Sequence, residues 1–77
     1  MIRLETETRY YTIKYQEDLL GDIVIICDFG SKSTHRAKRH TIFVDSIEKT
    51  QYIIDKIVKK RISRGYGLVL NQLIFNE

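Results

Sequence analysis

Alternation of apolar and polar residues predicts a β-strand near the start of the chain. Residues 9–16 are rich in tyrosine, threonine and isoleucine, which are common in strands. Successive strand side chains point to opposite faces, so Tyr11, Ile13 and Tyr15 would share one face. The polar and glycine-containing residues 17–22 that follow predict a hairpin connection.

Two further strands are predicted by short apolar runs. Residues 23–29 are apolar on both faces as far as Ile26, a pattern typical of a central strand that is covered on both sides. Residues 40–44 form a third candidate strand. The short connections between these three strands favour an antiparallel meander.

Apolar residues then recur at helical spacing. Either Asp45 or Ser46 can serve as the N-cap, and Asp45 with Glu48 has the spacing of a capping box. Cations near the end of the segment complement a helix dipole, and Gly65 is well placed as the residue that ends the helix. The apolar positions predicted to face the sheet are Ile47, Ile54, Ile57, Val58 and Ile62.

The last part of the chain leaves two structures open. Residues 66–75 contain two apolar triplets separated by Asn71 and Gln72, which fits a fourth strand or a short helical tail. The sequence therefore predicts an α+β fold, in which an antiparallel sheet of three to four strands has one helix packed across it.

Length and composition favour one small domain. The chain has 77 residues, no proline and one cysteine, so we expect a single domain over residues 1–77 without an internal disulfide. Its longest uninterrupted apolar run, residues 23–27, is too short for a bilayer, and acids near the amino terminus argue against a signal peptide. We therefore expect a cytoplasmic protein with no membrane partner.

The segment 29–40 changes this picture, because it gathers cations without any acid. The net charge of the chain is only +3, so the local field here is stronger than the total suggests. Such a cluster between two strands is typical of a nucleic-acid-binding surface. The alternative is a solvated surface loop whose charges only aid solubility. Its cations are Lys32, Arg36, Lys38 and Arg39.

Several short motifs occur together in an order that resembles one family. A tyrosine pair lies on the first predicted strand, Asp18-Leu-Leu-Gly-Asp22 lies in the turn, and an aromatic-glycine pair opens the basic loop. Asp45-Ser46 precedes the helix and Arg64-Gly-Tyr66 closes it. Over about residues 9–69 this arrangement resembles the WGR domain, found in DNA-dependent poly(ADP-ribose) polymerases and in short bacterial proteins, with residues 70–77 as a tail.

The resemblance implies DNA as the ligand and places Phe29-Gly30-Ser31 at the Trp-Gly-Arg signature. In the family the tryptophan packs against a sugar at a DNA break, so Phe29 would keep a stacking role. Ser31 lacks the charge and fork geometry of the family arginine. The alternative for Phe29 is a core position, because it continues the face of Ile23, Ile25 and Cys27.

Metal binding and catalysis find little support in the sequence. Cys27, His35 and His40 are the only soft ligands, and their spacing fits no tetrahedral zinc motif. There is no phosphate-binding glycine loop and no nucleophile elbow, so we expect no cofactor and no enzymatic activity.

The sequence thus leads to two functional hypotheses. The first is a small nucleic-acid-binding module whose loop cations contact phosphates, with Phe29, Lys32, Arg36, Lys38 and Arg39 as its site residues. The second is a protein-interaction or assembly domain, in which the apolar tail between Leu68 and Phe75 is buried in a homodimer or against another protein.

Overall fold

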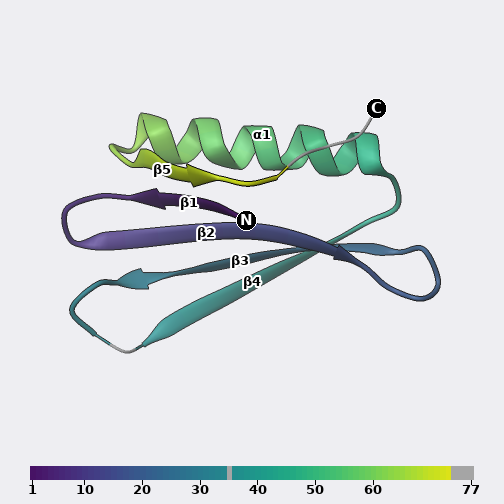
Figure 1. Cartoon of the computed structure of the whole chain (residues 1–77), viewed down its shortest axis with the longest axis horizontal. Helices are drawn as coiled ribbons and strands as arrows, with labels where there is room; N and C mark the ends of the chain where they lie inside the picture. Colours follow the sequence, from purple (N-terminus) through teal and green to yellow (C-terminus); the bar gives the residue numbers. More distant parts are fainter. Residues whose placement is uncertain (35, 74–77) are drawn as a thin grey trace.

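The computed structural model describes residues 1–34 and 36–73 and shows one five-stranded sheet with one helix across it (Figure 1). The strand order is β4-β3-β2-β1-β5, and every neighbouring pair is antiparallel. The predicted α+β class is confirmed, with five strands where three to four were expected. The strands are β1 (Ile2–Glu5), β2 (Arg9–Glu17), β3 (Ile23–Ser31), β4 (Ala37–Val44) and β5 (Gly67–Asn71), and the helix is α1 (Ile47–Ser63).

The additional strand is β1, which lies between β2 and β5. This strand was not predicted, because four residues are too few for a clear alternating pattern. The long hairpin of β2 and β3 is in regular register from Arg9 opposite Ser31 to Glu17 opposite Ile23. The β2–β3 turn lies at one end of this hairpin, and the β1–β2 and β3–β4 connections lie at the other.

The core lies between α1 and one face of the sheet. As predicted, Tyr11 and Ile13 share this face and are buried. From the helix, Ile54 is 2% exposed and joins them. The buried apolar residues of this cluster are Ile2, Leu4, Tyr11, Ile13, Ile23, Ile25, Cys27, Val44 and Ile54. Their burial supplies the main driving force for folding.

Both ends of α1 have regular caps. Ser46, one of the two predicted N-caps, has extended backbone angles and its hydroxyl oxygen accepts a hydrogen bond from the Lys49 N–H at 3.2 Å. At the other end Gly65 has φ of 95°, which confirms its predicted role. The Gly65 and Tyr66 N–H groups donate to the carbonyl oxygens of Ile62 and Arg61, as in a Schellman motif.

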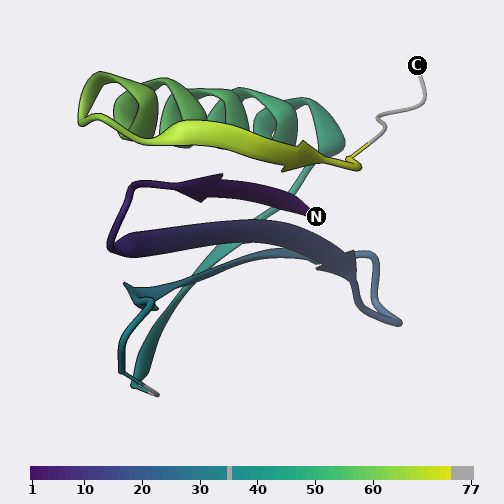
Figure 2. The same cartoon turned by 60° about the vertical axis from the view of Figure 1, so that its left-hand side comes forward.

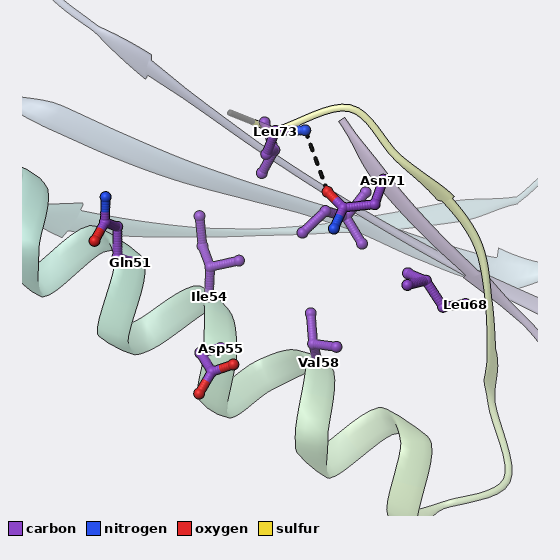
Figure 3. Close-up of a pocket in the computed structure, with 8 residues that line it drawn as sticks. Gln51, Ile54, Asp55, Val58, Leu68, Asn71 and Leu73 are labelled. Carbon is purple, nitrogen blue, oxygen red and sulfur yellow. Dashed lines mark hydrogen bonds between the residues drawn. The ribbon is translucent and has the colours of Figure 1, made fainter. Parts of the chain in front are cut away.

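The segment after the helix is a strand rather than a helical tail. Strand β5 pairs with β1, with an irregularity in register between Arg3 and Leu4. Beyond it Leu73 packs against the core, and its N–H donates to the Asn71 side-chain oxygen at 3.3 Å (Figure 3). Within the predicted interface between Leu68 and Phe75, the side chains of Leu68 and Val69 are exposed, and Phe75 lies outside the described residues.

The second face of the sheet differs from the expectation of a covered central strand. No described element lies across this face, as the turned view shows (Figure 2). Ile26 points to it yet is only 8% exposed. The register places Lys14 and Thr41 on either side of Ile26, so neighbouring side chains on adjacent strands shield it. In the described part of the chain, no helix is long and apolar enough to cross a bilayer.

Candidate nucleic-acid interface

The loop between β3 and β4 is shaped by Gly30. A Cβ atom at this position would lie 2.7 Å from the backbone oxygen of Arg36 and 3.3 Å from the Tyr10 hydroxyl. Real side chains do not tolerate the first of these distances, so the two sides of the loop approach each other only because residue 30 has no side chain. The glycine of the Phe29-Gly30-Ser31 tripeptide therefore sets the loop closure.

Two of the four predicted phosphate-binding cations are already engaged in ion pairs. The Lys32 ammonium lies 2.6 Å from a Glu5 carboxylate oxygen. The Arg39 guanidinium donates two hydrogen bonds to Asp28, at 2.7 and 3.0 Å. Lys32 and then Arg3 hold the pKa of Glu5 below its ordinary value, and Arg39 does the same for Asp28. Both cations are therefore partly neutralised within the protein.

The other two cations are exposed on and beside β4. Arg36 precedes the strand and Lys38 is its second residue, and among the described residues no acid pairs with either. Lys38 lies opposite Phe29 in the register, so its side chain is on the helix-bearing face. Arg39 lies on the other face, opposite Asp28. The five predicted site residues are thus divided between the two faces.

A hollow of about 570 Å³ lies where α1 ends over β2, β3 and β4. We call it the basic hollow. It holds three of the predicted site residues together with three that the sequence did not single out as binding residues. Its lining consists of Tyr11, Phe29, Lys38, Arg39, His40 and Arg61. Two cations, Lys38 and Arg61, and the His40 imidazole thus share the face of the Tyr11 and Phe29 rings, whereas the Arg39 side chain points to the other face.

Arg61 is the helix residue that completes the basic hollow. Its guanidinium carbon lies 4.8 Å from the centre of the Tyr11 ring and 6.0 Å from that of Tyr66. The Nε atom is buried and has no hydrogen-bond partner within the described residues. An unpaired buried donor is costly, and such groups need an explanation such as a missing ligand. The guanidinium is therefore held in place by aromatic rings rather than by acids.

Phe29 combines both roles that the sequence left open. Its ring stacks on Tyr11 with centres 5.4 Å apart and planes 13° apart, and it packs against the core. It is nevertheless only partly buried and lines the basic hollow. Tyr11 is more enclosed, and burial followed by its hydrogen bond with Cys27 raises the pKa of its hydroxyl. The pair forms a rigid aromatic wall.

The signal in the sequence that could have identified Arg61 as a residue of the basic hollow is its helical spacing. It follows Ile54, Ile57 and Val58 at intervals of seven, four and three residues, which places it on the sheet-facing side of α1. Among the other cations near the end of the helix, Lys59 pairs with Asp55 at 2.9 Å. His40 follows from strand alternation with Lys38, once the strand is known to start at Ala37.

Among the described candidates for metal binding, Cys27 and His40 are neighbours on adjacent strands. Cys27 is fully buried, and burial raises the pKa of its thiol. It lies opposite His40 in the register, while His35 lies outside the described residues. Within residues 1–34 and 36–73, no three histidine, cysteine or acidic side chains form a group that could hold a metal ion.

A second hollow, of about 450 Å³, lies between α1 and β5 and is lined mainly by apolar side chains (Figure 3). Ile54, Val58, Leu68 and Leu73 supply most of its wall. Its acid, Asp55, is occupied by Lys59. This hollow is open to solvent, since Leu68 in its wall is 49% exposed, and none of the cations of the basic hollow lines it.

Comparisons with models of protein families, with curated proteins and with solved structures find no match to this chain.

Proposed function

We propose that this protein is a small, non-enzymatic module that binds the phosphate backbone of nucleic acid at the basic hollow and the adjoining loop. The observation that carries the proposal is the position of the Lys38 and Arg61 cations beside the stacked rings of Tyr11 and Phe29. Proteins that bind a nucleic-acid strand commonly combine cations, which contact phosphates, with aromatic side chains, on which bases or sugars stack.

The chemistry assigns different tasks to these groups. Arg61 offers a guanidinium whose fork geometry matches a phosphate, and its Nε–H awaits an acceptor. Lys38 supplies a mobile point charge on the same face, and Arg36 extends the charge along the loop. Phe29 presents an apolar surface for a sugar or base. Nothing here reads base edges, so we propose contact with the backbone rather than sequence readout.

The resemblance to the WGR domain agrees with this proposal. Phe29 occupies the position of the signature tryptophan and lines the basic hollow. The position of the signature arginine is Ser31, whose hydroxyl instead lies 3.0 Å from that of Ser33. Arg61 reaches the hollow from the helix and brings the guanidinium that Ser31 lacks. DNA is accordingly the first ligand to test.

The test is fluorescence anisotropy of labelled blunt duplex, nicked duplex and single strand across a salt series. Lys32 and Arg39 are already paired with acids. The phosphate contacts expected to contribute to the salt slope are therefore those of Arg36, Lys38 and Arg61. Each phosphate neutralised contributes about −0.9 to the slope of log K against log salt, so we expect about −2 to −3 for duplex. Absence of binding to every probe at low salt would overturn the proposal.

A further inference from the structure

The edge strand β4 has an exposed length of backbone without a partner in the described residues. It is eight residues long, and all eight are in regular register with β3 on its other side. The other edge, β5, is five residues long and has an irregular register. Short and irregular strands protect sheet edges, whereas a long regular edge is a template for another strand. β4 is therefore the edge suited to pairing.

Charge is distributed unevenly along β4. Its first half carries Lys38 and Arg39, with Arg36 just before it. Its second half has no charged residue, and Asp45 follows its last residue. Asp22 lies beside this acidic end, since it lines the same hollow as Asp45. A strand with this polarity repels a parallel copy of itself, but an antiparallel copy brings each basic end to an acidic end.

We propose that β4 pairs antiparallel with β4 of a second copy of this chain, with Thr41 on the two-fold axis, to form a continuous ten-stranded sheet. Centring on Thr41 places Arg39 opposite Phe43 of the second copy, and Ala37 opposite its Asp45. Arg39 and Phe43 both lie on the face without the helix, so the two side chains meet. The contact between them is a cation–π interaction, with the Arg39 guanidinium over the Phe43 ring.

This pairing accounts for Phe43, which is 81% exposed. In the single chain it lies beside Val24 on the open face and Arg39 lies beside Asp28. In the pair, one row of side chains crosses the junction. It consists of Val24 and Phe43 of one copy followed by Arg39 of the second copy. α1 lies across one face of the sheet, where it contacts β3, β4 and β5, and it leaves the outer edge of β4 open to a second strand (Figures 1 and 2). The interface is isologous, as most dimer interfaces are.

The first experiment measures mass by sedimentation or light scattering of the full chain over a concentration series. We expect the weight-average mass to rise from 9.1 kDa toward twice that value. Phe43→Lys places a cation opposite Arg39 twice in each pair and should return the protein to a monomer. The matched control is Val69→Lys, at a residue 59% exposed on the other edge strand, which should leave association unchanged. A mass that stays at 9.1 kDa at all concentrations would overturn the proposal.

The second experiment fixes the register. Opposed residues of antiparallel strands have Cα atoms about 4.5–5.5 Å apart, within the range that a disulfide spans. Thr41→Cys should therefore form a crosslinked dimer under mild oxidation about tenfold faster than Val69→Cys, because pairing gives a millimolar effective concentration. The natural Cys27 is fully buried and does not compete. Faster crosslinking through Val69→Cys would instead assign the interface to β5 and contradict the proposal.

Discussion

At the scale of single residues, Arg61 is the side chain whose environment is most at odds with a purely structural role. It is held over Tyr11 and lines the basic hollow, while its buried Nε atom lacks a partner. A structural arginine would be expected to satisfy its donors with an acid or a carbonyl oxygen. The proposed phosphate supplies the missing acceptor.

Arg61→Met separates binding from stability. Methionine keeps much of the apolar stem and removes the charge together with the unpaired donor. Loss of the cation–π contact costs about 0.5–2 kcal/mol, and relief of the buried donor recovers about 1–3 kcal/mol. We therefore expect the free energy of unfolding in urea to change by between a loss of about 1 kcal/mol and a gain of about 2.5 kcal/mol, while nucleic-acid affinity falls and the salt slope drops by about one unit. A destabilised variant with full affinity would show that Arg61 only supports the fold.

Asp28 acts as an internal competitor for phosphate, because its two carboxylate oxygens accept hydrogen bonds from Nε and Nη2 of Arg39. Asp28→Asn should release Arg39, tighten nucleic-acid binding and steepen the salt slope by about one unit. The matched control is Asp45→Asn, which removes the same charge at the opposite end of β4, where Asp45 pairs with Lys49 at 3.1 Å. An equal gain in affinity from both variants would mean that only net charge matters.

At the scale of elements, the hairpin of β3 and β4 positions the site. The register of β3 with β4 places Phe29 beside Lys38. The close approach of Gly30 to the Arg36 carbonyl oxygen closes the loop, so that β4 begins at Ala37, opposite Gly30. The end of α1 then fixes Arg61 over the same face through the hydrogen bond from the Tyr66 N–H to its carbonyl oxygen. The basic hollow is thus made by one hairpin and one helix end.

Gly30→Ala tests this closure. Its Cβ would collide with the Arg36 carbonyl oxygen, so we expect a loss of about 1–3 kcal/mol in the free energy of unfolding, as for other overpacked sites. Gly67→Ala is the matched control, because its nearest atom, the Glu5 oxygen, would be 3.8 Å away. That variant should be neutral or slightly stabilised. Urea denaturation of both proteins provides the comparison, and equal stability of the two would contradict the role given to Gly30.

Most elements were predictable from the sequence, because period-2 and helical patterns are strong in long segments. The hairpin of β2 and β3, the helix and its glycine cap follow from such patterns. β1 was missed since it is four residues long, and β5 stayed open since its apolar triplet fits either structure. The cations of the loop were visible, but their ion pairs with Glu5 and Asp28 were not, because both acids come from other strands.

At the scale of the whole molecule, charge is separated along the strands. The end with the β3–β4 loop and the helix C-terminus carries cations, and the opposite end carries acids around the β2–β3 turn and the helix N-terminus. The molecule is 38 Å along its longest axis. A net charge of +3 therefore coexists with a strongly basic end, which would orient the protein on a polyanion. Binding at the basic hollow should therefore depend on the position of a charge rather than on the total charge.

The measurement that tests this claim most directly compares the nucleic-acid affinity of Lys38→Gln with that of Lys56→Gln by anisotropy over a salt series. Each variant loses one positive charge, but Lys38 lines the basic hollow, while Lys56 lies on exposed helix surface, 4.8 Å from the centre of the Tyr52 ring. We predict weaker binding and a salt slope smaller by about one unit for Lys38→Gln alone. Equal losses in the two variants, or none in either, would contradict binding at the basic hollow.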